Sequence, residues 1–121
     1  MGSGVGIMPV RIKVNEMQIA HKIDTAWETG REMLCSQILK DCNLYCKEDT
    51  GMLIMSSYIH SDLKKGRLVW ATPYAAKQYY EIPTAFHDVN PNAVWRWVEY
   101  AQTMHGADWG KMAQAITRYY K

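Results

Sequence analysis

Residues 10–14 read VRIKV, and residues 15–46 continue as NEMQIAHKIDTAWETGREMLCSQILKDCNLYC. This stretch decides the fold because its hydrophobic period changes from two to about 3.6 after Val14. The alternation of apolar and cationic residues over 10–14 predicts a β-strand with one solvated face. Apolar residues at steps of three and four then predict a single long helix, which Asn15 would cap and which would run from about residue 16 to about residue 46.

A turn and a β-hairpin are predicted after the long helix. The cluster KEDTG at 47–51 favours a turn, because Asp and Thr side chains bond their own backbone and Gly accepts a positive φ angle. Residues with β-propensity then predict strands at 56–61 and 67–72, joined by the connection DLKKG at 62–66.

Three helices are predicted in the last third of the chain. Pro73 is suited to the first position of a short helix. After a loop rich in helix-breaking residues, Asn90 or Asn92 would cap a second helix, which Gly106 would end. A final helix is predicted over residues 107–120, where apolar residues again recur at steps of three and four.

These elements predict the fold class and the domain organisation. Strands and helices are segregated along the chain, which is typical of an α+β fold with an antiparallel sheet. We therefore expect a small antiparallel sheet packed against a long N-terminal helix, with further helices towards the C-terminus. Residues 1–9 are expected to form a flexible leader, and residues 10–121 a single α+β domain.

The composition agrees with one globular domain. The 121 residues are 48% apolar and 21% charged, which is enough apolar surface for a core and too little charge for a disordered tail. No apolar run approaches the roughly 18 residues of a membrane span, so no membrane partner is expected. A net charge of +2 offers no electrostatic reason to bind nucleic acid, which is not an expected partner.

Residues with catalytic chemistry occur without the surroundings that this chemistry needs. The tripeptide DTG at 49–51 matches aspartic proteases, but it follows CKE where an apolar strand is required. Cys35, Cys42 and Cys46 lie on the helical stripe with no histidine close in sequence, which is typical of packing residues. We therefore predict no catalytic residue, no cofactor and no metal site.

An ordered series of short motifs runs through residues 10–121. After the helix and its turn it comprises Leu53, Ser57, Trp70, TPYA at 72–75, NPNA at 90–93, Trp97 and Trp109. This series resembles the minor capsid proteins encoded in the head-morphogenesis modules of tailed phages and prophages and, more distantly, tail-completion proteins. One departure concerns the exit from the helix, where the family often has a proline before the turn acid and this chain has Lys47 and Glu48.

The resemblance implies structural roles for individual residues. Asp49, Thr50 and Gly51 match the family's turn. The packing or motif residues that it implies are Leu53, Ser57, Trp70, Tyr74, Ala75, Trp97 and Trp109.

The resemblance also implies a structural, non-enzymatic virion protein at or near the head-to-tail junction. It would assemble with connector, tail or capsid subunits and with copies of itself, in the host bacterial cytoplasm and then in the virion. We predict an assembly edge along Val10, Ile12 and Val14, because an edge strand can pair with a strand of a neighbour. Two alternatives stay open, a small DNA-binding accessory domain and a cysteine-dependent enzyme.

Overall fold

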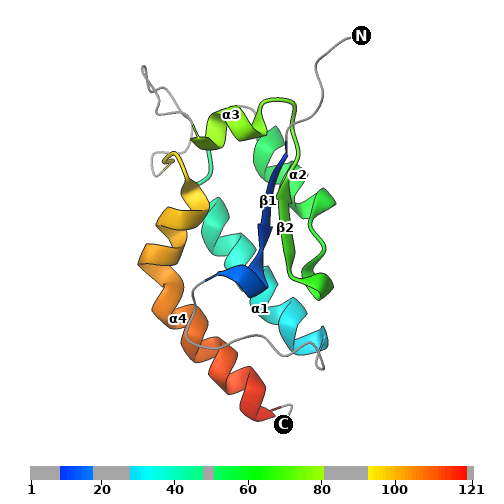
Figure 1. The fold of residues 1–121 in the computed structure, drawn as a ribbon, viewed down its shortest axis with the longest axis vertical. Helices are drawn as coiled ribbons and strands as arrows, with labels where there is room; N and C mark the ends of the chain where they lie inside the picture. Colours follow the sequence, from blue (N-terminus) through cyan, green and yellow to red (C-terminus); the bar gives the residue numbers. More distant parts are fainter. Residues whose placement is uncertain (1–8, 18–27, 48–50, 81–92, 120–121) are drawn as a thin grey trace.

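The computed structural model describes residues 9–17, 28–47, 51–80 and 93–119 (Figure 1). In chain order its elements are β1 (Val10–Lys13), the 3-10 helix η1 (Val14–Glu16), α1 (Glu28–Asn43), α2 (Met52–His60), the 3-10 helix η2 (Leu63–Lys65), β2 (Arg67–Trp70), α3 (Ala75–Tyr80) and α4 (Trp97–Tyr119). The fold is mixed α+β, as predicted, and the sheet of the described residues has two antiparallel strands.

The sheet pairs a strand near the start of the chain with a strand just past its middle. β1 and β2 are antiparallel, and Val10 lies opposite Trp70. Val14 extends the ladder, since its backbone N–H donates to the Gly66 carbonyl over 2.7 Å. The strand predicted at 10–14 is therefore confirmed over Val10–Lys13.

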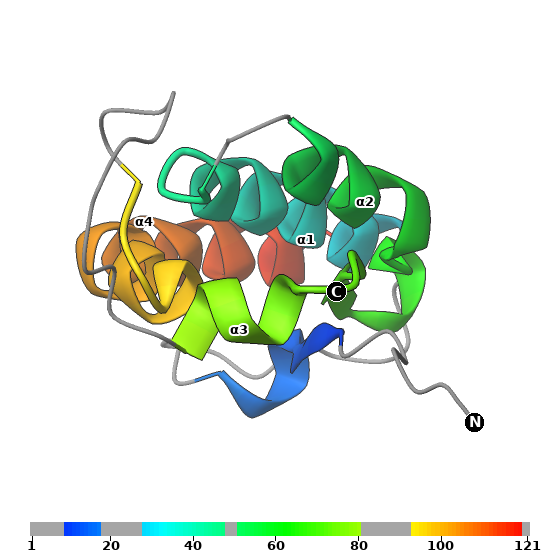
Figure 2. The same cartoon turned by 90° about the horizontal axis from the view of Figure 1, so that it is seen from above.

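The hydrophobic core lies where α1 meets the sheet and α4. α1 occupies the middle of the fold, with α4 along one side and β2 and α2 on the other (Figures 1 and 2). Three tryptophans from different parts of the chain, Trp70, Trp97 and Trp109, are almost fully buried there. The rings of Trp70 and Trp97 pack edge to face with centroids 5.8 Å apart, a geometry that aromatic pairs prefer. This contact fixes β2 against the start of α4.

The long N-terminal helix predicted from residue 16 is wrong at its start. Val14–Glu16 form a 3-10 turn, and Met17 is extended, with φ −74° and ψ 145°. Residues 18–27 lie outside the described part of the chain, and the longest described helix is the C-terminal α4 rather than α1. The physical reason is the bond from Val14 to Gly66, which keeps the backbone at this point in the sheet.

The prediction of a hairpin is also wrong, because the residues predicted as its first strand, 56–61, lie mostly in the helix α2. β2 pairs with β1 instead, and an isolated bridge between Asp62 and Arg67 is what remains of the predicted pairing. Ser56 and Ser57 help to explain the difference. Each hydroxyl donates over 2.6 Å to the carbonyl three residues earlier, so these polar side chains are satisfied within a helix.

The C-terminal region holds one helix where two were predicted. α4 continues through Gly106, which was expected to end a helix. A glycine inside a helix costs about 1 kcal/mol, and the burial of α4 residues such as Trp109 against α1 outweighs this cost. The predicted short helix is present as α3, but it begins at Ala75 rather than at Pro73, which lies in the turn before it. The caps predicted at Asn90 and Asn92 lie outside the described residues.

Candidate functional site

The outer edge of β2 is covered by α2 and the residue that follows it. The Val69 N–H donates to the Ser61 hydroxyl over 2.9 Å, and the Ala71 N–H donates to the Ser56 hydroxyl over 3.0 Å. Serine hydroxyls therefore accept the hydrogen bonds that a third strand would otherwise accept, and a partner strand cannot pair here without displacing them.

The outer edge of β1 directs backbone groups away from the sheet. In an antiparallel pair, successive residues point their backbone groups alternately towards the partner strand and away from it. The backbone N–H of Val14 bonds towards β2, and every second residue of β1 has the same orientation, so the backbone groups of Val10 and Ile12 also face β2. Arg11 and Lys13 alternate with them and direct their N–H groups to the other side. The N–H groups that face outward from this strand therefore belong to Arg11 and Lys13. Val10, Ile12 and Val14, which were predicted as the assembly edge, bond within the sheet.

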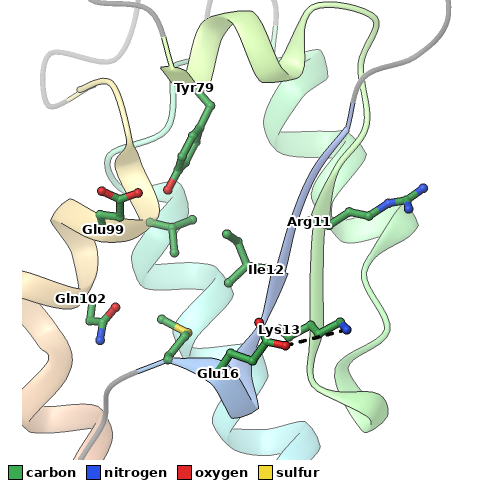
Figure 3. Close-up of a pocket in the computed structure, with 9 residues that line it drawn as sticks. Arg11, Ile12, Lys13, Glu16, Tyr79, Glu99 and Gln102 are labelled. Carbon is green, nitrogen blue, oxygen red and sulfur yellow. Dashed lines mark ion pairs between the residues drawn. The ribbon is translucent and has the colours of Figure 1, made fainter.

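A hollow of about 300 Å³ lies along this edge of β1, facing the start of α4 (Figure 3). The residues that line it are Arg11, Ile12, Lys13, Glu16, Met17, Tyr79, Val98, Glu99 and Gln102. The Ile12 side chain points into the hollow, whereas the side chains of Arg11 and Lys13 point away from it (Figure 3). An extended segment placed here could bond the backbone of β1 and cover Ile12.

Tyr79 brings a buried hydroxyl to the α3 end of the hollow (Figure 3). The Arg96 N–H donates to the Tyr79 carbonyl over 2.8 Å, and the Tyr79 and Trp97 rings pack edge to face at 4.6 Å, so α3 is held against α4. Within the described part of the chain no group accepts a hydrogen bond from this hydroxyl, and the backbone N–H of Glu99 lies close enough to stabilise its oxygen. Burial, together with the charge of Glu99, raises the pKa of Tyr79, and this backbone N–H opposes the rise in part.

Charges around the hollow are mixed. Lys13 and Glu16 form an ion pair with 3.8 Å between Nζ and Oε1, and both side chains are exposed. Such exposed pairs contribute about 0–1 kcal/mol. Arg11 and Glu99 add one more charge of each sign to the lining. The residues that line the hollow therefore carry charges of both signs, and the Arg11 and Lys13 side chains direct theirs away from it (Figure 3).

The residues implied by the family resemblance are mostly packing residues in the structure. Six of them are buried, namely Leu53, Ser57, Trp70, Ala75, Trp97 and Trp109, whereas Tyr74 is 63% exposed. Gly51 adopts a left-handed conformation with φ 79° directly before α2. Asp49 and Thr50 lie outside the described residues. Sequence reasoning did not single out Tyr79 or the backbone of Arg11, because their proximity depends on how α3 and β1 pack.

Cys35, Cys42 and Cys46 are all buried, and the Cys46 thiol donates to the Lys47 carbonyl over 3.5 Å. Burial raises the pKa of Cys35 to about 12, and the charge of Arg31 opposes this only in part. Burial and the charge of Asp41 raise the pKa of Cys42 as well. Protonated thiols are weak nucleophiles at neutral pH, so these two positions do not favour the cysteine-dependent alternative. Among the described residues, no group of three or more His, Cys, Asp or Glu side chains is arranged to hold a metal ion.

A small α+β domain with an outward-facing strand edge and buried thiols is typical of a protein that works by contact. A family model for minor capsid proteins matches residues 10–116 of the 121-residue chain. The chain belongs to this family and is therefore a structural protein of a phage virion, which implies that it is not an enzyme.

Two further comparisons add no relative. No curated protein and no solved structure matches the chain. Within the described residues, no helix combines the length and the apolar character that crossing a membrane requires.

Proposed function

We propose that this minor capsid protein acts at the head–tail connection or in tail completion, where its β1 edge pairs with an extended segment of a neighbouring virion protein. The observation that carries the proposal is the outward edge of β1 beside the hollow, in a chain of the minor capsid family. The neighbour would be a connector, tail or capsid subunit, and the contact would form in the host bacterial cytoplasm during particle assembly.

The addition of a strand would use the outward backbone groups of β1 and the Ile12 side chain that points into the hollow. The incoming segment would accept a hydrogen bond from the Arg11 N–H and donate one to the Arg11 carbonyl, as strands do in β-augmentation. Each such bond contributes about 0.5–1.5 kcal/mol. An apolar side chain of the segment would cover Ile12. Specificity would then come from the shape of the hollow rather than from charge.

Two substitutions at one position test the proposal. Arg11→Pro removes an outward N–H, whereas Arg11→Ala removes only the side chain and serves as the matched control. Ile12→Pro is unsuitable because the Ile12 backbone bonds to β2. Proline is tolerated on the outer side of an edge strand, so we expect Arg11→Pro to change the unfolding free energy by less than about 1 kcal/mol.

The experiment uses a phage in which the native gene for this protein is replaced by the gene for one of the variants. The particles that each phage forms are then compared. Arg11→Pro should leave heads and tails unjoined and lower the titre of infectious phage, whereas Arg11→Ala should join them normally. Normal titres with a folded Arg11→Pro protein would rule out edge pairing. Incomplete heads, rather than unjoined ones, would move the role from the junction to the capsid shell.

A further inference from the structure

α2 turns Leu53, Ser56 and Ser57 inward and a largely apolar side outward. Ile54 is partly buried and packs against the core. The exposed large apolar side chains of α2 are Met52, Met55, Tyr58 and Ile59, which are between 58% and 68% exposed, and His60 at the end of the helix is exposed as well. We call the four large apolar residues the α2 face. Positions 52, 55 and 59 follow the i, i+3, i+7 spacing of a single helical stripe.

Hydrogen bonds hold α2 in this orientation. The Ser57 hydroxyl accepts from Asn43 Nδ2 over 2.9 Å, and Asn43 Oδ1 accepts from Trp70 Nε1, also over 2.9 Å. The Ser56 hydroxyl accepts from the Ala71 N–H over 3.0 Å. Rolling α2 to bury the α2 face would break the two bonds that end on Ser56 and Ser57, and it would leave the Asn43 amide and the Ala71 N–H without these acceptors. The exposure of the α2 face is therefore built into the fold.

The area of the α2 face is close to what a small interface needs. A large side chain offers about 200 Å² when fully accessible, so the four residues together expose on the order of 500 Å² of mostly apolar surface. Contiguous apolar patches of this size commonly mark interaction sites. Two such faces in contact would bury roughly 1,000 Å², which is the lower limit for a specific protein–protein interface.

The chemistry of the α2 face suits contact with a copy of itself. No Asp, Glu, Lys or Arg occurs from Met52 to Ser61, so two copies would bring no like charges together. In an antiparallel pair of α2 helices, Met52 would lie opposite Ile59 of the second copy, and the two Met55 side chains would meet near the axis. Unbranched Met side chains adapt readily to such self-packing.

We infer that the α2 face forms a two-fold symmetric contact between two copies of this chain. A two-fold contact uses the same patch on both subunits, and the symmetric order Met52, Met55, Ile59 satisfies this condition. The inference rests on the proposed role in assembly but concerns another surface, since α2 lies beyond β2 and the proposed pairing edge is the outer edge of β1 (Figure 1). One chain could therefore contact a neighbouring protein and a second copy at the same time.

The test uses the purified full chain and sedimentation velocity over a concentration series. Because the interface is small, we expect the native protein to change from monomer to dimer at about 10–100 µM. Met55→Lys and Met55→Glu each place like charges at the axis and should raise the dimer dissociation constant at least about tenfold. An equimolar mixture of the two variants brings opposite charges together and should restore dimer formation. Met104→Lys, at an exposed position on α4, is the matched control and should leave the dimer unchanged.

Three results would overturn the inference. The native chain could remain monomeric over the whole series, or the Met55 variants could dimerise as the native chain does. Loss of the dimer in both variants without recovery in the mixture would show that the face binds some other surface. Circular dichroism of each variant checks that its fold is kept. Because no virion is involved, failure here is distinct from failure of edge pairing, which only the particle experiment measures.

Discussion

Replacing Asn43 with alanine would test whether a buried polar network joins α1, α2 and β2. Asn43 accepts a hydrogen bond from Trp70 Nε1 and donates one to the Ser57 hydroxyl, both over 2.9 Å, and all three residues are buried. In Asn43→Ala the Ser57 hydroxyl keeps its own bond to the Ile54 carbonyl. The Trp70 indole N–H, in contrast, would be buried without its partner.

The expected effect follows from these two losses. A buried donor left unpaired costs about 1–3 kcal/mol, and the lost bond to Ser57 about 0.5–1.5 kcal/mol. We expect Asn43→Ala to lower the unfolding free energy by about 2–4 kcal/mol, which is a large part of the roughly 5–15 kcal/mol of a typical domain. Urea denaturation followed by circular dichroism at 222 nm, a wavelength that reports on backbone helicity, measures this change.

A double-mutant cycle separates the network from the general effect of removing atoms. Trp70→Phe removes the N–H but keeps an aromatic ring, and Asn43→Ala in that background no longer strands the indole donor. The two substitutions should therefore be non-additive, with the double variant more stable than the sum predicts by about 1 kcal/mol or more. Additivity within about 0.5 kcal/mol would refute the reasoning, since independent sites behave in this way.

Two other predictions concern backbone conformation and thiol ionisation. Gly106→Ala should raise the unfolding free energy by about 0.5–1 kcal/mol, because the added Cβ meets only an ordinary contact inside α4. Gly51→Ala should lower the unfolding free energy by about 1–2 kcal/mol, because φ is 79° at this position. Urea denaturation curves of both variants check these values, and a destabilised Gly106→Ala would contradict the reasoning. The pKa of Cys35 is about 12 in the fold and its ordinary value is 9.0, so stability should be unaffected below about pH 9 and fall as the pH rises towards 12. Cys35→Ala should lose less stability than the native chain between about pH 8 and pH 11, and parallel curves would contradict the assignment.

Several parts of the fold could be predicted from local sequence alone. The alternation over 10–14 identified β1, because a period of two needs no knowledge of the partner strand. The ordered motifs identified the minor capsid family, which the family model confirms over residues 10–116. Pro73 indicated a short helix, and α3 follows it, although it begins two residues later, at Ala75.

The prediction failed where two structures satisfy the same local pattern. A short apolar run with two serines, such as that around Ser56 and Ser57, is compatible with a strand or a helix. Gly106 is compatible with a helix end or a helix interior, and only the burial of residues on both sides of it decides for one continuous helix. The outer edge of β1 was predicted as a strand edge, but the hollow next to it depends on packing between distant segments.

The sequence by itself determined the α+β class, the strand at the start of the fold and the family, because each of these follows from local patterns and their order along the chain, whichever segments pack together. Only the tertiary structure decided that β2 pairs with β1 and that α2 turns its serines inward. The bonds that enforce this choice reach Ser56 and Ser57 from Ala71 and Asn43, which lie 15 and 14 residues away. Local propensity cannot register hydrogen bonds over such separations, and it therefore could not foresee the outward apolar face of α2.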